Sequence, residues 1–284
     1  MHSLATPALI LLAISTGLPG PAVTTDDNGG AKLAKPVSWG SPDEPYGTRR
    51  AVTTADRAAI SAYRNGSRKP VYATTFTDAA ELDSHWEMVS DDNRYGDYLS
   101  CRRPASVQTT PAGLRIKTLV ATDCGHKWST GYIASRTHYT FGFFEERVMI
   151  ADITGLDNAL WLTTSDNYEI DAAEIYYPSY IHYGLQYWPH NMTEKHTGMG
   201  WGAYYTSNLA QGFHDVGLLW TPTEIIYEID GEPVAAAETH GSVKGAAAVR
   251  ISSALLSGVG KLPEHPEGHD MQVKSMRIFA YAAQ

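Results

Sequence analysis

Three carboxylates within six residues, Glu169, Asp171 and Glu174, constrain the fold of this chain more than any other feature. They interrupt a stretch that otherwise has the composition of a buried strand, where an unpaired charge is costly. Alternate residues of a strand share a face, so Glu169 and Asp171 point the same way and Glu174 the opposite way. Glu174 rejoins them only if Ala172 and Ala173 form a β-bulge. The sequence therefore predicts a bulged strand with three carboxylates on one surface, which could supply a nucleophile and a proton donor for cleaving a glycosidic bond.

Aromatic residues on both sides of the acids favour a binding cleft over the alternative, a solvated strand face. Trp161 lies in an apolar run before the acids, and Tyr176 and Trp188 follow them. Flat aromatic side chains beside carboxylates suit the stacking of sugar rings. Trp161 and Trp188 could instead be ordinary core residues.

The composition fits one globular domain and a substrate without strong negative charge. The chain has 284 residues, of which 43% are hydrophobic and 19% charged, and its formal net charge is -9. This charge argues against nucleic acid as a partner, because nucleic-acid binding needs a basic surface. It gives no support for binding to an anionic membrane either. We expect no nucleic-acid or membrane partner and a monomer.

Three regions follow one another along the chain. Residues 1–22 contain a short apolar run and resemble a secretory signal peptide, although no Lys or Arg precedes the run. The alternative is a mis-assigned start or a flexible tail. Residues 23–69 are expected to form a linker or surface strap with one short helix at 54–63, started by a Thr cap. Residues 70–284 are the predicted catalytic domain of a secreted, extracellular protein.

From residue 71 onward, short apolar and aromatic runs alternate with turn signals, which is typical of an all-β sandwich. Asp230-Gly231 is a two-residue hairpin signal, and residues 271–281 are the last expected strand. Residues 189–212 are interpreted as a long loop and groove wall that carries Trp201, Tyr204 and Tyr205.

The two cysteines, Cys101 and Cys124, are expected to form one disulfide, since a secreted chain with an even pair commonly bridges it. Free thiols are the alternative. Neither cysteine has the paired spacing of zinc ligands, and His190, His196 and His214 lack helical two-histidine spacing. We expect no catalytic metal and no cofactor, and leave a structural cation open.

Beyond the acids, the chain resembles glycoside hydrolase family 16 in its bulged Glu-x-Asp-x-x-Glu form, the laminarinase- and agarase-like branch. The resemblance covers roughly residues 70–284 in the right order. It includes a Ser-Gly-x-Ile-x-Ser-like strand, a Gly-x-Phe-Glu-x-Arg-like segment, an Ala-x-Trp-Leu-like strand and a Phe-His…Trp-Thr-Pro-like segment, at residues 128–135, 141–147, 159–162 and 213–222.

This resemblance implies a curved β-jelly roll, a concanavalin A-like sandwich with a concave substrate groove. It implies a retaining endo-glycosidase in which Glu169 is the nucleophile, Glu174 the general acid/base and Asp171 a modulator of the nucleophile. The candidate substrate-binding residues are Trp161, Tyr176, Gln186, Trp188 and Trp201. Gln186 stands where the family often has His or Asn, and could be a strand residue without a catalytic part.

A β-linked polysaccharide is the expected substrate, with β-1,3-glucan slightly preferred to a galactan. The chain departs from the family at Ala172-Ala173, where many bulged members carry Ile-Met. Two alternatives stay open: a carbohydrate-binding protein without activity, which would not need all three acids, and a transglycosylase for wall polymers.

Overall fold

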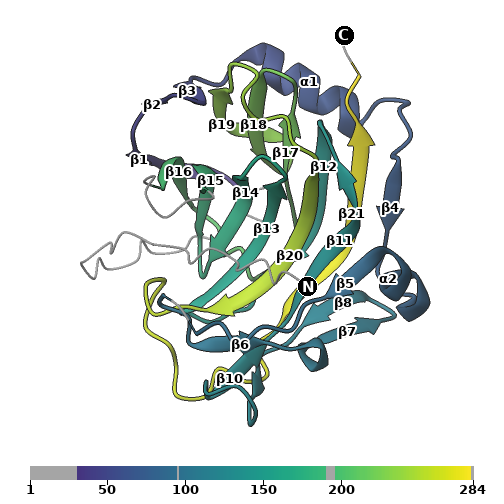
Figure 1. The fold of residues 1–284 in the computed structure, drawn as a ribbon, viewed down its shortest axis with the longest axis vertical. Helices are drawn as coiled ribbons and strands as arrows, with labels where there is room; N and C mark the ends of the chain where they lie inside the picture. Colours follow the sequence, from purple (N-terminus) through teal and green to yellow (C-terminus); the bar gives the residue numbers. More distant parts are fainter. Residues whose placement is uncertain (1–30, 95, 190–195, 283–284) are drawn as a thin grey trace.

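Two curved sheets packed face to face form the body of the protein (Figure 1). The computed structural model describes residues 31–94, 96–189 and 196–282. The candidate signal peptide, His190 and the first part of the expected loop lie outside the described residues. Within them, no helix is long and apolar enough to cross a membrane.

The eight-stranded sheet carries the three carboxylates. Its strands, in order across the sheet, are β1 (Leu33–Gly40), β16 (Thr197–Tyr205), β15 (Tyr180–Tyr187), β14 (Tyr168–Tyr176), β13 (Leu156–Thr164), β20 (Ala247–Leu255), β11 (Tyr132–Tyr139) and β5 (Trp86–Met88).

The ten-stranded sheet packs against its other face. In order, it contains β2 (Asp43–Glu44), β3 (Gly47–Arg50), β19 (Glu232–Glu238), β18 (Glu224–Ile229), β17 (His214–Trp220), β12 (Gly142–Met149), β21 (Met271–Ala280), β8 (Gly113–Ile116) and β7 (Val107–Thr110), with β4 (Tyr72–Thr74) also pairing with β21. A small third sheet joins β6 (Ser100–Arg102), β10 (Trp128–Thr130) and β9 (Leu119–Val120).

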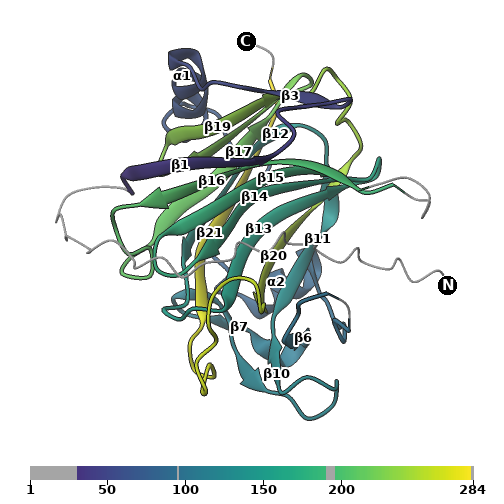
Figure 2. The same cartoon turned by 90° about the vertical axis from the view of Figure 1, so that its left-hand side faces the viewer.

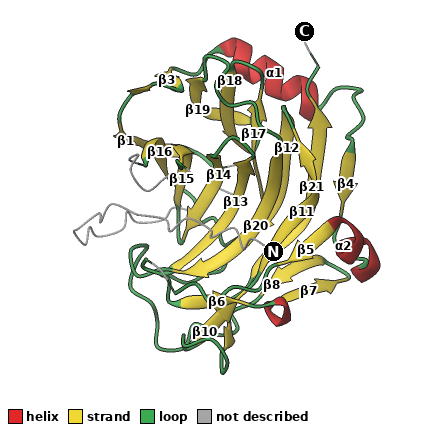
Figure 3. Ribbon diagram, viewed as in Figure 1, coloured by secondary structure: helices red, strands yellow, loops and turns green. Residues whose placement is uncertain are grey.

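The core lies between the two large sheets and is filled by alternate residues of each strand. Leu160, Ile170 and Leu185 from the eight-stranded sheet meet Phe144 and Met276 from the other, and each is at most 1% exposed. The period of two seen in the sequence therefore sets which side chains face the core and which face the groove. The predicted all-β jelly roll is confirmed (Figure 3).

The N-terminal segment differs from the expected linker, because it adds strands to both sheets. β1 pairs with β16 at the edge of the eight-stranded sheet, and β3 pairs with β19 at the edge of the other (Figure 2). The polar composition of residues 33–50 concealed these strands, since edge strands are partly solvated and need few apolar residues.

Two α-helices complete the described fold. α1 (Thr54–Arg64) confirms the predicted helix, with a capping box between Thr53 and Asp56. Its Ile60 and Tyr63 pack on the outer face of the ten-stranded sheet. The second helix, α2 (Ala79–His85), was not predicted, because its seven residues are too few for a clear helical period. A 3₁₀ turn spans Pro104–Ser106.

The expected disulfide is present and joins Cys101 on β6 to Cys124 in the loop after β9. The two cysteines are 23 residues apart in the sequence. The loop between them contains the 3₁₀ turn and strands β7 to β9, so the bridge ties β6 of the small third sheet to the segment that follows its strand β9.

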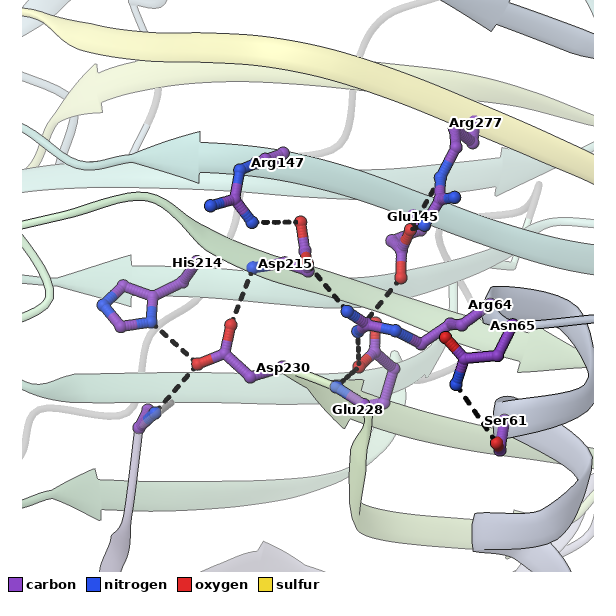
Figure 4. A network of polar contacts seen from close by, with 12 residues as sticks. Ser61, Arg64, Asn65, Glu145, Arg147, His214, Asp215, Glu228, Asp230 and Arg277 are labelled. Carbon is purple, nitrogen blue, oxygen red and sulfur yellow. Dashed lines mark hydrogen bonds and ion pairs between the residues drawn. The ribbon is translucent and has the colours of Figure 1, made fainter. Parts of the chain in front are cut away.

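Arg64 connects α1 to buried acids of the ten-stranded sheet (Figure 4). Its guanidinium lies 3.0 Å from Glu145, 3.2 Å from Glu228 and 2.7 Å from Asp215. Glu145 also binds Arg277. Burial and the nearby Glu145 raise the pKa of Glu228 to about 8, and Arg64 opposes this rise. Arg64 offsets only part of the cost of burying Glu228. The stability of the fold should therefore be sensitive to loss of this cation.

Replacing Arg64 by Met should lower the free energy of unfolding by about 3–5 kcal/mol, because it leaves buried carboxylates without their shared partner. A carboxyl whose pKa is raised in the folded state stabilises the fold below its unfolded pKa, and this contribution declines as pH rises towards the folded pKa. The deficit of the Arg64→Met variant should therefore widen between about pH 5 and pH 8. Urea unfolding at both pH values measures it.

Arg57→Met is the matched control on the same helix. Arg57 pairs with Glu232, but both side chains are more than half exposed, at 54% and 56%. Its loss should change the free energy of unfolding by less than about 1 kcal/mol. Equal effects of the two substitutions would show that the Arg64 network does not stabilise the fold.

Candidate active site

A β-bulge in β14 brings the three acids to one face. Asp171 pairs with Gly184 and Glu174 with His182, so Ala172 and Ala173 together stand opposite a single residue of β15. The pairing with β13 shifts at the same place. The predicted bulge is confirmed, and without it Glu174 would point into the core.

Both alanines of the bulge face the core, and each is 0% exposed. Two consecutive side chains therefore share the space that one side chain fills in a regular strand, which favours small residues. The acids on the other face are also deeply set: Glu169 and Asp171 are 2% exposed and Glu174 is 3% exposed.

Strand β15 supplies two polar partners for these acids. The Gln186 side-chain amide donates to Glu169 Oε1 at 3.3 Å and to Asp171 Oδ2 at 2.9 Å. Nδ1 of His182 is hydrogen-bonded to Glu174 Oε2. Gln186 thus holds the proposed nucleophile and its neighbour together, while His182 holds the proposed acid/base. His182 was not chosen from the sequence, although its alternation with Gln186 placed it on this face.

Trp161 lies beside the acids on β13, opposite Asp171 in the strand pairing. Its indole N–H donates to Ser252 Oγ at 3.0 Å, and its ring stacks on Tyr132 at 5.6 Å. The Arg250 guanidinium lies 5.0 Å from the ring centre. Trp161 therefore forms a fixed wall of the site, only 8% exposed.

A pocket above the acids is lined by residues from distant segments. Tyr98 and Arg102 reach it from the chain that leads into and through β6, and Asp157 reaches it from β13. Arg102 is 3% exposed, and its guanidinium lies 4.5 Å from the centre of the Tyr132 ring. None of the three was predicted from the sequence, since nothing local links them to β14.

Burial dominates the electrostatics of the three acids. It raises the pKa of Glu169 and of Glu174 well above the usual range, and repulsion from Asp171 raises both further. The Trp188 indole N–H and Arg102 oppose the rise at Glu169. Burial also raises the pKa of Asp171, against the effects of His182 and Gln186. The cluster therefore retains protons at pH values where isolated carboxyls are ionised.

The pKa values of two neighbours of Glu174 shift in opposite directions. Burial lowers the pKa of His182 to about 4, so its ring is neutral near neutral pH. Burial, together with the charge of Glu174 and a hydrogen bond to it, raises the pKa of Asp157 well above its usual range. Glu174 thus lies between a neutral imidazole and a carboxyl whose pKa is also raised.

The remaining predicted contacts divide into two groups. Trp188 is half-buried next to Glu169, with its ring stacked on His196 at 3.8 Å. Tyr176 lies on the acid face but is 9% exposed and packs against Ala254 and Leu256. Its ring stacks on Tyr180 at 5.6 Å. Both lie where a substrate contact was expected.

Trp201 was wrongly predicted as a substrate contact. Residues 197–205 form strand β16 and not a loop, and alternation turns Trp201 towards the core. There it packs on Tyr227 of the ten-stranded sheet, with ring centres 5.4 Å apart. Tyr205 also faces inward and hydrogen-bonds Tyr183 at 2.8 Å. Only Tyr204 of the three aromatics lies on the groove side, against Tyr180.

Metal-ligating atoms gather at two places in the described residues. One group consists of Asp123 and the two cysteines, but the cysteine sulfurs are already bonded to each other. The other is Asp171, Glu174 and His182, with one ligand atom of each within 4.8 Å of the others. In this second group, His182 is hydrogen-bonded to Glu174 and Gln186 donates to Asp171.

Comparison with known proteins finds one matching family model and one similar curated relative. The model of Glycosyl hydrolases family 16 matches residues 101–261. Endo-1,3-1,4-beta-glycanase EglC of Rhizobium meliloti (strain 1021) is 29% identical over 122 residues, which are 40% of this chain and 25% of the relative. The chain thus matches only about a quarter of that relative's length.

Two solved structures share the fold. The laminarinase catalytic domain from Thermotoga maritima MSB8 aligns with a TM-score of 0.66 at 13% identity, covering 76% of this chain and 99% of that one. The endo-beta-1,3-glucanase from Pyrococcus furiosus aligns with a TM-score of 0.66 at 16% identity, covering 76% and 96%. The family model spans more than half of the chain and contains the bulged strand with its three acids, and the chain therefore belongs to glycosyl hydrolases family 16.

Proposed function

We propose that the protein is a secreted, retaining endo-β-glucanase that hydrolyses a β-1,3-linked glucan. The observation that carries the proposal is the bulge at Ala172 and Ala173, which presents Glu169, Asp171 and Glu174 on one face. Regulatory or purely structural carboxylates have no need of this arrangement.

The compact spacing of the acids supports retention of configuration. One amide nitrogen of Gln186 contacts both Glu169 and Asp171, and Asp171 and Glu174 share a cluster with His182. Retaining glycosidases place their two carboxyls about 5–5.5 Å apart, whereas inverting enzymes need about 6.5–9.5 Å to admit a water.

In the first step, Glu169 attacks the anomeric carbon while Glu174 protonates the departing glycosidic oxygen. Arg102 and the Trp188 N–H favour the ionised form of Glu169, as the nucleophile requires. Burial and the charge of Asp171 keep a proton on Glu174, as the acid requires.

In the second step, Glu174 takes a proton from water, which displaces Glu169 from the sugar and releases the product. His182 orients the Glu174 carboxyl through the hydrogen bond from Nδ1. The hydrogen bond with Asp157 opposes the rise in the pKa of Glu174 and so stabilises the ionised state that Glu174 passes through between the two steps.

The preference for β-1,3-glucan rests on the names of two proteins of similar structure, a laminarinase and an endo-beta-1,3-glucanase. The Rhizobium relative acts on mixed 1,3-1,4 linkages by its name, so mixed-linkage glucan is the second substrate to test. The Cys101–Cys124 disulfide supports secretion, because such bonds persist in oxidising compartments.

Replacing Glu169 by Gln should lower kcat on laminarin by about 10³-fold or more, because the amide cannot act as a nucleophile. Reducing-end release measures activity, and NMR of the first-formed product anomer tests retention. Glu238→Gln, an exposed acid on the opposite sheet, is the control and should keep full activity.

An unchanged rate in Glu169→Gln would overturn the nucleophile assignment. A wild-type protein that binds glucans without releasing reducing ends would instead be a carbohydrate-binding protein. Longer products in the presence of added acceptor sugars would identify a transglycosylase that uses the same two steps.

Replacing Asp171 by Asn should move the pH profile of kcat/KM to lower pH. The charge of Asp171 raises the pKa of both Glu169 and Glu174, so its removal lowers both values. The acid limb, set by ionisation of Glu169, and the alkaline limb, set by deprotonation of Glu174, should both shift in the same direction. The Asn oxygen can still accept from Gln186, which preserves the local geometry. Unshifted limbs would show that Asp171 does not tune the pair.

A further inference from the structure

One row of residues across the eight-stranded sheet leads from the acids to its edge. Asp171 on β14 pairs with Gly184 on β15, Gly184 pairs with Gly200 on β16, and Gly200 pairs with Trp39 on β1. Two consecutive strands therefore contribute only glycine to this row, and a tryptophan ends it. The four strands β14, β15, β16 and β1 lie side by side in Figure 2.

Gly184 and Gly200 are each covered by a neighbouring side chain that leaves no room for a Cβ atom. A Cβ added to Gly184 would stand 2.3 Å from Asp171 Oδ2, so the acid leans over this glycine from one side. A Cβ added to Gly200 would stand 1.9 Å from two carbons of the Trp39 ring, so the indole leans over it from the other side. The tryptophan is thus laid across the sheet towards the acids.

Trp39 also touches the partner of the proposed acid/base. Its ring stacks on His182, with centres 4.8 Å apart and planes 29° apart. Unlike Trp161, which is 8% exposed between Tyr132 and Arg250, Trp39 is only half-buried. Part of its indole therefore remains accessible on the face that carries the acids, on the opposite side of the acids from Trp161.

We propose that Trp39 is a stacking platform for a glucosyl unit of the substrate, at a subsite remote from the cleaved bond. This inference rests on the proposed function and specifies how that site recognises a long chain. Trp39 lies outside residues 101–261, the part matched by the family model, so the N-terminal strand adds a substrate contact that the family match does not contain.

The dimensions of the sheet suit such a subsite. The ring overlies β16, two strands from β14, and neighbouring strands are about 4.8 Å apart, so the platform lies about 10 Å from the acids, roughly two sugar units away. One side of a β-linked glucosyl ring carries only C–H groups, which pack on a flat aromatic surface. The glycine row adds no side chain of its own between Asp171 and Trp39, so these two side chains lie directly on the sheet.

The competing explanation is that Trp39 only positions His182, and through it Glu174. The two roles make different predictions. A platform contributes only when the substrate is long enough to reach it, whereas a positioning residue affects every substrate and moves the pH profile through Glu174.

The test measures kcat/KM for a series of β-1,3-linked gluco-oligosaccharides of increasing length, with wild type, Trp39→Ala and Trp39→Phe. We expect the gain in kcat/KM with chain length to be about 10-fold smaller for Trp39→Ala at the longest oligosaccharides. The shortest cleaved substrate and the pH profile should be unchanged. Trp39→Phe should restore part of the gain.

Ser38→Ala is the matched control, because Ser38 lies on the same strand, is exposed and points to the opposite face. Equal losses at all chain lengths, or a shifted alkaline limb, would overturn the platform and assign Trp39 a positioning role. An unchanged chain-length profile in Trp39→Ala would overturn both roles. If the wild type cleaves none of these glucans, the proposed function is wrong. The platform is then tested separately, by calorimetry of the longest oligosaccharide binding to wild type and to Trp39→Ala, and equal affinities would overturn it.

Discussion

One extra residue in strand β14 decides the chemistry of this face. The bulge turns Ala172 and Ala173 together into the core and returns Glu174 to the side of Glu169 and Asp171. The hydrogen bond with His182 and the interaction with Asp157 depend on it, because both are made to Glu174 on that side. A regular strand would separate the acids by the thickness of the sheet.

Buried carboxyl groups gather at two places in this fold, and their neighbours differ in charge. Around Arg64, acids of the ten-stranded sheet are paired with cations, which links helix α1 to the sheet. Around Glu174, the acids lie mainly beside other acids and neutral donors, so their pKa values rise and protons are retained. The first arrangement suits stability, and the second suits proton transfer.

The N-terminal segment contributes strands to both sheets and a tryptophan to the face that carries the acids. β3 and α1 fasten it to the ten-stranded sheet, while β1 extends the eight-stranded sheet and carries Trp39 to His182. A segment of polar composition is therefore an integral part of the structure. Its strands are stabilised by backbone pairing with β16 and β19 and not by a hydrophobic pattern of their own.

The sequence alone determined the all-β class, the cysteine pair, the bulge and the three acids, because each depends on local spacing or on the period of a strand. It also placed Gln186 and Trp188 on the acid face by alternation. Only the tertiary structure brought Trp39, Tyr98, Arg102 and Asp157 to the acids, and only it turned Trp201 into the core. These residues come from strands and loops that are distant along the chain, and their proximity depends on sheet order and register, which no local pattern encodes.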